Sequence, residues 1–391
     1  MDKMLEKAFE YVESHRDEAI AMYRDMINTK SYAREPEGVV KMAHLLKGML
    51  VAEGFECKLI DVGTNGPTLV GVLGADRPGK PIIFSGHMDT VLSNDTYPDE
   101  PFRIEDGKAY GPGVLDMKGG LSIALNTVKA LNYAGWAERP IKFLISGDEE
   151  INHTGSKGAK VFEEEARGGL CAFNLETSPV NNCLCVFRKG NTRFNITVEG
   201  REVHAGNDYE KGINAIDEMA FKIIDLRAMT NMEIGTTINC GVIKGGTVSN
   251  AVPKHCEMEV DMRFCSVEEM NKAKAKAEEL AMRTHVVGTK TSFRYLNIMD
   301  VFEETSEGYR FYEFISKVSE EIGMGSIPAV RLGGGSDAAY TTMAGVPTVC
   351  SCGIRGEWNH TTREYAVVES LFERSKLYAA VVMRIGEFVK E

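Results

Sequence analysis

Apolar, strand-like runs that end abruptly in histidine or acidic residues restrict the fold of this chain more than any other feature. The run "KPIIF" leads into "SGHMDTV", which holds His87 and Asp89, and "FLIS" leads into "GDEE" at 147–150. "FNLETSP" repeats the pattern with Glu176. Ligands of open α/β sheets bind at the carboxyl ends of the strands. The chain therefore predicts a sheet whose strand ends carry a functional site.

Helical patterns alternate with these strand-like runs, which favours an α/β fold with a mixed sheet flanked by helices on both faces. "RLGGGSDAAYTTMAG" resumes the rhythm near the C-terminus as a strand, a loop and a helix. The pattern predicts helices at 3–28, 37–53, 119–134, 156–166 and 366–389, and strands at 56–61, 68–74, 81–86, 140–146 and 170–175.

The pattern changes between residues 190 and 299. Strand-like segments at 192–200, 235–247 and 254–264 accompany helical patterns at 212–229 and 266–284, the second with Ser266 as its N-cap. We predict a compact α+β domain at 190–299, inserted into a discontinuous domain formed by residues 1–189 and 300–391.

Composition restricts the partners and the compartment. The formal net charge of −12 and the lack of a prominent basic patch argue against nucleic acid or an anionic membrane as a partner. The N-terminal stretch predicts a charged amphipathic helix and not a signal peptide, and no apolar run is long enough to span a membrane. The nine cysteines include no CxxC pair and are expected to be reduced. We expect a cytoplasmic protein.

His87 and Asp89 share one face of a strand, because alternate residues of an extended chain point the same way. A carboxylate that accepts one imidazole N–H leaves the other ring nitrogen free to bind a metal. Taken alone, this pair is more typical of a surface hydrogen bond. Asp116 in "GPGVLDMKGG" is likewise compatible with an N-capping aspartate, and His360 in "EWNHTTREYA" with a structural histidine. The convergence of such clusters at strand ends favours a metal site.

A charge sum tests this hypothesis. Three carboxylates contribute −3, and two divalent metals with one bridging hydroxide contribute +3, so a partly buried cluster would be neutral. Mixed nitrogen and oxygen ligands suit Zn²⁺, and Co²⁺ or Mn²⁺ would also fit. The candidate ligands are His87, Asp116, Glu150, Glu176 and His360.

The ordered motifs "SGHMDTV", "PFRIEDGKAYGPGVLDMKGG", "SGDEE", "NLETS" and "NHTTREYA" resemble the M20 dizinc metallopeptidases. The resemblance is strongest to the glutamate carboxypeptidase, or carboxypeptidase G2-like, branch and covers nearly the whole chain. It implies a zinc-peptidase-like catalytic domain with an inserted lid or dimerisation domain, since "TVEGREVHAGNDYEKGINAI" matches the family's dimerisation signature. It also implies a homodimer.

The same resemblance assigns a role to each candidate residue. His87 and Glu176 would hold one zinc, Glu150 and His360 the other, and Asp116 would bridge them, followed by a cis peptide bond to Met117. Asp89 would orient His87, and Glu149 would be the general base. His204 would stabilise the oxyanion from the partner subunit, and Asn250 and Arg263 would hold the α-carboxylate of the substrate.

The implied activity is hydrolysis of the amide bond to a C-terminal amino acid by a metal-bridged hydroxide. The stretches 177–187 and 296–302 offer no basic residue for a glutamate side chain, so a neutral or apolar amino acid is as compatible as glutamate. A deacylase of N-acyl amino acids with the same centre is the main alternative. "LGGGSDA" lacks the second glycine of a serine-hydrolase elbow, and the chain has no GxGxxG dinucleotide motif. A silent metal-binding protein is disfavoured by the presence of Glu149.

Overall fold

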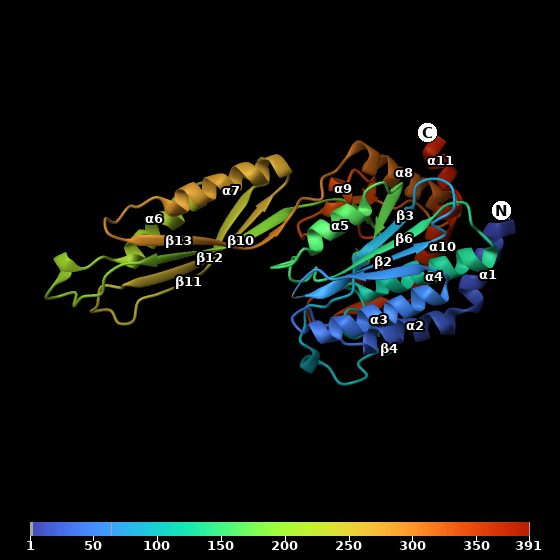
Figure 1. Cartoon of the computed structure of the whole chain (residues 1–391), viewed down its shortest axis with the longest axis horizontal. Helices are drawn as coiled ribbons and strands as arrows, with labels where there is room; N and C mark the ends of the chain where they lie inside the picture. The colour runs from blue at the N-terminus through green and yellow to red at the C-terminus, as the bar shows by residue number, and fades with distance from the viewer. Residues whose placement is uncertain (1–2, 64, 391) are drawn as a thin grey trace. The chain divides into compact units, whose positions relative to one another are not determined.

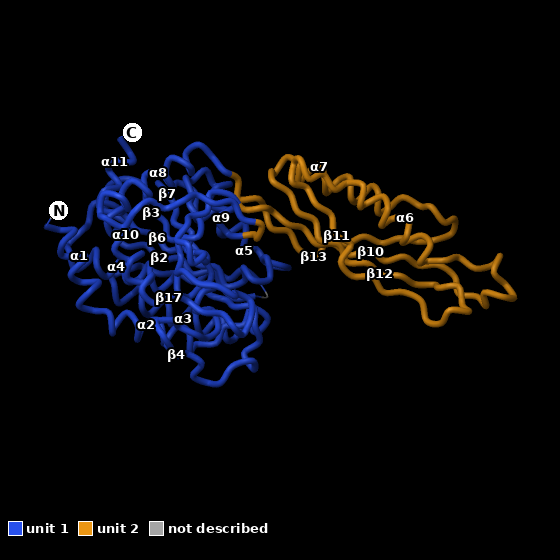
Figure 2. The backbone as a smooth tube through the Cα atoms, turned by 180° about the vertical axis from the view of Figure 1, so that it is seen from behind, with its two compact units in different colours: residues 1–187, 304–332, 336–391 blue, residues 188–303, 333–335 orange. Residues whose placement is uncertain are grey.

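The computed structural model describes residues 3–63 and 65–390, which form two compact units (Figure 2). The first unit combines Met1–Phe187, Glu304–Leu332 and Ser336–Glu391. The second unit combines Arg188–Glu303 with the short stretch Gly333–Gly335. In these described ranges, no helix has the length and apolarity that a membrane span requires.

A six-stranded mixed sheet forms the centre of the first unit. Strands β3, β6, β7 and β15 are parallel to one another, whereas β1 and β2 add two antiparallel strands at one side. The strand order is β1 (Glu56–Ile60), β2 (Gly66–Leu73), β6 (Ile141–Gly147), β3 (Ile82–His87), β7 (Cys171–Asn174) and β15 (Thr348–Val349).

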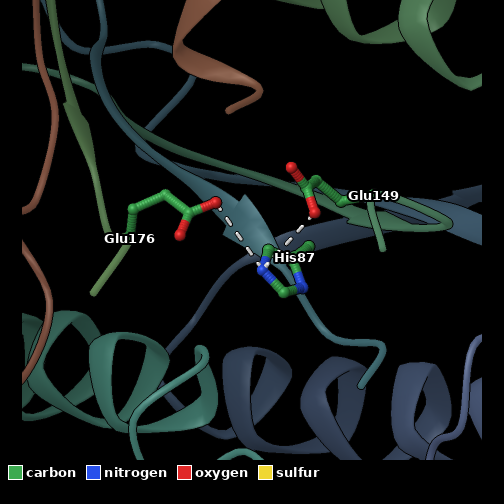
Figure 3. A group of neighbouring side chains, drawn as sticks. All are labelled: His87, Glu149 and Glu176. Atoms are coloured by element: carbon green, nitrogen blue, oxygen red, sulfur yellow. Dashed lines mark ion pairs between the residues drawn. The ribbon is translucent and has the colours of Figure 1, made fainter. Parts of the chain in front are cut away.

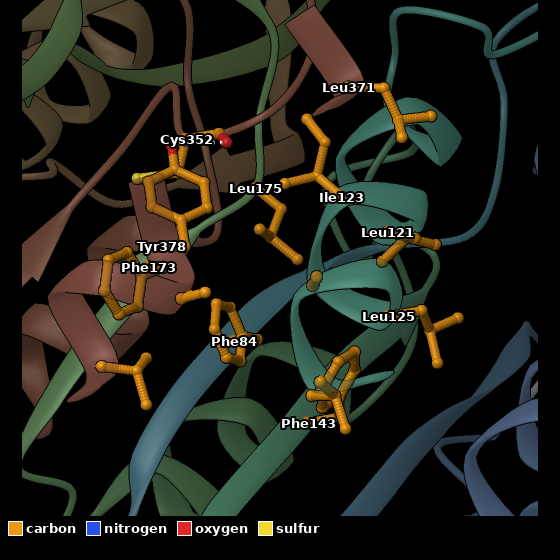
Figure 4. Packing of buried hydrophobic residues seen from close by; sticks show 14 of the residues in the cluster. Phe84, Leu121, Ile123, Leu125, Phe143, Phe173, Leu175, Cys352, Leu371 and Tyr378 are labelled. Atoms are coloured by element: carbon orange, nitrogen blue, oxygen red, sulfur yellow. Dashed lines mark hydrogen bonds between the residues drawn. The ribbon is translucent and has the colours of Figure 1, made fainter. Parts of the chain in front are cut away.

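Helices cover both faces of this sheet, as the sequence predicted (Figure 1). Phe84, Phe143 and Phe173 lie side by side on three neighbouring strands (Figure 4). Phe173 packs against the rings of Phe311 and Tyr378, and the same core includes the buried residues of α4. The opposite face carries α5, which packs against α9. The helices of this unit are α1 (Lys3–Ser14), α2 (Arg16–Asn28), α3 (Pro36–Ala52), α4 (Lys118–Ala134), α5 (Gly158–Ala166), α8 (Ser306–Glu321), α9 (Ala338–Met343), α10 (Glu369–Met383) and α11 (Ile385–Lys390).

Two predicted helices are interrupted. The helix predicted at 3–28 breaks at His15, where the Ser14 hydroxyl and the His15 ring bond to the carbonyl oxygens of Glu10 and Tyr11. Such side-chain bonds compete with the helical ladder. The helix predicted at 366–389 begins only at Glu369, because the first predicted residues lie in a strand, β17 (Tyr365–Val367). This helix also ends at Met383, and α11 follows it as a separate helix.

Short strands complete the first unit. A five-stranded sheet has the order β4 (Arg103–Glu105), β5 (Lys108–Tyr110), β17, β16 (Arg355–Glu357) and β8 (Ser178–Pro179). A further pair joins β14 (Ala329–Leu332) to β9 (Leu184–Arg188).

The second unit is a four-stranded antiparallel sheet with two helices, α6 (Ala215–Arg227) and α7 (Val267–Met282). Alternate residues of β12 are buried, as expected for a sheet covered on one face. The Ser266 hydroxyl accepts the N–H of Glu269 and caps α7, as predicted. The strand order is β11 (Thr237–Gly245), β12 (His255–Phe264), β10 (Gly190–Glu199) and β13 (Lys290–Met299), of which β13 was not predicted.

Candidate metal centre

The carboxyl ends of three parallel strands bring polar side chains to one edge of the large sheet. His87 is the last residue of β3, Glu149 follows the end of β6, and Glu176 follows the end of β7. Because β3 lies between β6 and β7, the two glutamates flank the histidine (Figure 3). The apolar runs of these strands hold the polar ends in place, since Ile82 to Phe84 are fully buried.

Carboxylate oxygens surround the Nε2 atom of His87. This atom lies 3.2 Å from Asp116 Oδ1, 3.7 Å from Glu176 Oε1 and 4.0 Å from Glu149 Oε2. The His87 ring has 1% of its surface exposed, so these contacts are screened from water. A ring nitrogen and several carboxylates that are shielded from water either bind a metal ion or share protons among themselves.

Asp116 lies between two histidines. Its Oδ1 atom faces His87, whereas its Oδ2 atom lies 3.1 Å from the Nε2 atom of His360. His360 Nε2 is also 3.3 Å from Glu150 Oε2. Asp116 immediately precedes Met117, the N-cap of α4, and the Asp116–Met117 peptide is cis, as the resemblance implied. One carboxylate therefore links two separate histidine–glutamate pairs.

Asp89 holds the opposite side of the His87 ring. Its Oδ1 atom lies 3.3 Å and its backbone oxygen 3.1 Å from His87 Nδ1. Its two carboxylate oxygens also accept the backbone N–H groups of Glu149 and Glu150, at 3.3 and 3.0 Å. Asp89 thus turns Nε2 of His87 toward the other carboxylates and ties β3 to the loop that carries both glutamates.

Sequence reasoning missed Glu364, a buried carboxylate beneath Asp116. Its Oε1 atom accepts the backbone N–H groups of Leu115 and Asp116, at 2.7 and 2.9 Å. Burial, with the nearby charge of Asp116, raises the pKa of Glu364 to about 8. Asn359 was also missed, and its side-chain amide donates to Asp116 Oδ2 at 3.0 Å. Both residues belong to "WNHTTREYA", where proximity to His360 is the only sequence signal.

Crowding of acids at the site changes their protonation. Burial raises the pKa of Glu149 well above its usual value, and the charges of Glu176 and Asp337 add to this effect. Burial opposes the charged form of His87, but hydrogen bonds to Asp116 and Asp89 outweigh it and raise its pKa. Hydrogen bonds to Asp116 and Glu150 raise the pKa of His360 to about 11. Without a metal, protons balance the negative charge of the cluster.

The sequence that carries this site matches the model of a known protein family. The family model described as "Peptidase family M20/M25/M40" matches residues 83–384. The chain belongs to this family. The prediction from the sequence motifs is thereby confirmed, and the protein is an enzyme of the metallopeptidase or amidohydrolase type.

The proteins that are similar to this M20 family member carry names that state different activities. It is 27% identical to carboxypeptidase G2 of Pseudomonas sp. (strain RS-16), over 97% of this chain and 92% of that protein. It is 23% identical to succinyl-diaminopimelate desuccinylase of Ehrlichia ruminantium (strain Welgevonden), over 95% and 97% of the two chains. The crystal structure of aminopeptidase PepT from Bacillus cereus ATCC 10987 shares the fold, with a TM-score of 0.78, 24% identity and coverage of 95% and 99%.

The residues at the site fit a metal. Two ligand atoms that are each about 2.1 Å from a tetrahedral zinc lie roughly 3.4 Å apart, and the contacts of His87 and His360 with Asp116, Glu150 and Glu176 span 3.1–3.7 Å. The Oε1 atom of Glu150 is buried and has no hydrogen-bond partner among the described residues. A cation would satisfy this oxygen, because buried carboxylates require a partner.

Three further predicted residues lie in the second unit. His204 and Ala251 form an isolated β-bridge, and the N–H of Ala205 donates to the carbonyl of Asn250 at 2.9 Å, so the segments of His204 and Asn250 are neighbours. Arg263 lies on β12 and pairs through Nε and Nη2 with both carboxylate oxygens of Asp261, at 2.7 and 3.0 Å. Asp261 fixes the plane of this guanidinium and was not predicted.

Proposed function

We propose that this M20 enzyme hydrolyses the amide bond to a C-terminal amino acid at a centre of two divalent metals, most consistent with zinc. The observation that carries the proposal is the position of Asp116, whose two oxygens face two different histidines. His87 with Glu176 would hold one metal, and His360 with Glu150 the other. In this proposal, the discontinuous domain at 1–189 and 300–391 is catalytic, and 190–299 is the lid.

Bound metals would supply two functions, namely polarising the scissile carbonyl and lowering the pKa of the attacking water. The chain itself supplies orientation and proton transfer. Asp89 fixes the ring of His87 and therefore the direction of its Nε2 lone pair. Glu364 fixes the backbone of Asp116 through two N–H groups. These contacts hold the proposed ligands at the distances observed.

Glu149 is the proposed general base. Its carboxylate lies at the edge of the cluster, 4.0 Å from His87 Nε2, which is farther than the contacts of the proposed ligands. Burial raises its pKa in the metal-free enzyme, and the positive charge of bound metals would favour the ionised carboxylate that a general base requires. Glu149 would take a proton from the attacking water and deliver it to the leaving amine.

Arg263 and Asn250 are the proposed partners of the substrate's free α-carboxylate. A guanidinium binds a carboxylate through parallel hydrogen bonds. Asp261 occupies Nε and Nη2 of Arg263, so its Nη1 is the atom with the weakest contact, 3.4 Å from the carbonyl of Gly333. The name of the relative carboxypeptidase G2 supports an enzyme of this class.

Deacylation of N-acyl amino acids is the second candidate function. The relative succinyl-diaminopimelate desuccinylase carries that type of activity in its name. Both reactions break an amide bond with the same centre, and they differ in which side of the bond is recognised. A carboxypeptidase recognises the C-terminal amino acid, whereas a deacylase recognises the acyl group. A requirement for the free α-carboxylate therefore supports carboxypeptidase activity only if the enzyme also accepts different acyl groups.

We further propose that the enzyme is a cytoplasmic homodimer, paired through the lid, in which His204 serves the partner's site as the oxyanion donor. Two features of the second unit support pairing. Strand β11 is at the edge of its sheet, with Val242 and Ile243 exposed, and α6 exposes Phe221 and Ile224. Unpaired strand edges and exposed apolar residues are typical of interaction surfaces.

The decisive experiment measures kcat/KM for matched N-acyl amino acids and their C-terminal amides, before and after dialysis against a strong chelator. We expect the amides to react far more slowly and the chelator to abolish activity, with zinc or cobalt restoring it. The panel varies the acyl group and the amino acid separately, which distinguishes a carboxypeptidase from a deacylase. Equal rates on acids and amides would contradict carboxylate recognition, and active enzyme without a transition metal would contradict the metal centre.

A further inference from the structure

A buried histidine lies between two carboxylates next to the loop of Glu149. His153 Nδ1 is 2.7 Å from Asp148 Oδ1, and His153 Nε2 is 2.8 Å from Asp337 Oδ1. None of these three residues exceeds 6% exposure. Asp148 comes from the end of β6, whereas Asp337 precedes α9. The mechanism proposed above gives this cluster no role.

With Asp148 and Asp337 ionised, the geometry requires His153 to carry both ring protons. A neutral imidazole has one N–H, and an ionised carboxylate can only accept, so two ring-to-carboxylate hydrogen bonds need an imidazolium. The second oxygen of each carboxylate already accepts other donors. Asp148 Oδ2 accepts the hydroxyl of Ser156, and Asp337 Oδ2 accepts that of Ser146 at 2.6 Å. Both oxygens of each carboxylate therefore face a hydrogen-bond donor.

The backbone of the loop from Asp148 to His153 is strained. Asn152 and His153 both have φ of 50°, a left-handed conformation that residues other than glycine rarely adopt. The turn is closed by Asn152 N–H to the carbonyl of Glu149 at 2.6 Å and by His153 N–H to the carbonyl of Asp148 at 2.9 Å. Such a conformation persists only when surrounding contacts hold it, and the His153 ring provides two of them.

Two elements outside the loop meet at the same ring. The carboxylate of Asp337 binds His153 through one oxygen and Ser146 on β6 through the other. The Tyr340 ring also packs against the imidazole in a T-shaped arrangement, with 5.4 Å between the ring centroids. The loop that carries Glu149 is thus fastened to β6 and to the segment before α9 through one side chain.

We propose that the His153 imidazolium, held between Asp148 and Asp337, is a positioning residue that fixes the loop presenting Glu149 to the reaction. This inference rests on the proposed function of Glu149 as general base. His153 is not among the residues proposed to contact the substrate or the metals. Its loss should therefore reduce the efficiency of proton transfer while substrate binding and metal binding remain.

The kinetic test combines His153→Gln with Glu149→Gln. We expect His153→Gln to lower kcat about 10–100-fold, with KM and bound metal unchanged within about twofold. In the Glu149→Gln background the same change should have almost no further effect, because residues that act through one another are not additive. An equal additional loss in both backgrounds, or a kcat of His153→Gln equal to that of the parent enzyme, would overturn the proposal.

The matched control is His255→Gln. His255 forms a histidine–carboxylate contact of the same 2.7 Å length with Glu199, but on the exposed surface of the second unit. This variant should keep the parental kcat. If Glu149→Gln itself retains full activity, the proposed base is wrong, and that outcome is separate from any result for His153.

Nuclear magnetic resonance tests the charge state of His153 directly. The measurement uses the parent protein and does not depend on enzymatic activity. Protein labelled with ¹⁵N at its histidine rings is measured at about pH 8, where a free imidazole is largely neutral. The His153 resonances are identified by their absence from His153→Gln, or by contacts with Tyr340 if that variant does not fold. We expect both ring nitrogens of His153 to be protonated, and a ring with one bare nitrogen would refute the proposal.

Discussion

Binding of metal to the chelator-stripped enzyme should release protons, because the centre holds protons where it would hold metals. The pKa of His360 is raised to about 11 by Asp116 and Glu150. The pKa of His87 is also raised, although its burial opposes this. Both rings are therefore charged in the metal-free enzyme at pH 7. A metal binds only a neutral imidazole, so each proposed site must expel a proton.

The magnitude follows from this count. The two histidine ligands alone release about two protons when both metals bind, which makes the combined association constant rise roughly 100-fold for each pH unit. At about 1.36 kcal/mol per proton and pH unit, this is a gain of about 2.7 kcal/mol. Metal affinity should rise in this way from about pH 7 up to the pKa values of the two histidine rings in the metal-free enzyme. For His360 this pKa is about 11.

The stability of the metal-free enzyme should depend on pH in the opposite direction. The pKa of Glu364 is raised to about 8, so the neutral carboxyl stabilises the folded chain below its unfolded pKa. This contribution is lost as the pH rises through about 8. We expect the Glu364 contribution to the metal-free Tm to fall as the pH rises from about 4.3, the unfolded pKa of a glutamate, to about 8, and to level off above that.

Isothermal titration of zinc into stripped enzyme, in buffers of equal pH and different ionisation enthalpy, measures the number of protons released. We expect at least about two at pH 7 for the parent enzyme, because burial also raises the pKa of the proposed ligand Glu150, and about one fewer for His360→Gln. His44→Gln is the control, because His44 is exposed on α3, away from the site, and should leave the number unchanged. Release of fewer than about one proton would refute the inference that protons replace metals in the empty centre.

Three further predictions concern single side chains. Glu149→Gln should keep the bound metal while kcat falls by at least about 10²–10⁴-fold; loss of metal with activity would make Glu149 a ligand. Glu364→Gln keeps an acceptor for two buried N–H groups, whereas Glu364→Ala should lower the free energy of unfolding by about 1–3 kcal/mol for each N–H left unpaired. Equal Tm values for the two Glu364 variants would contradict this. A His204→Ala subunit mixed with a Glu149→Gln subunit should regain activity if His204 acts on the partner's site, and no recovery would place His204 in its own subunit.

The strand-end positions of the site could be predicted from local pattern. His87, Glu149 and Glu176 each follow a short apolar run, and parallel strands bring such ends to one edge of the sheet. Asp116 and His360 lie outside the large sheet. The convergence of polar clusters favoured both as metal ligands, but only the resemblance to a family assigned which residue shares a metal with which. The break at His15 was missed because the competing side-chain bonds are visible only in three dimensions.

Glu364 and His153 show why the residues that position a site escape sequence reasoning. Each is a charged residue in a polar stretch, and such residues are usually exposed. Here each is buried because a remote partner satisfies it: Glu364 accepts two N–H groups that precede α4, and His153 reaches Asp337. Burial of a polar or charged group costs energy unless its partners are in place, and the partners become neighbours only when the sheet has formed. Ligand types can therefore be found from residue type and strand position, whereas the groups that aim them become recognisable only once the fold shows which polar side chains are buried.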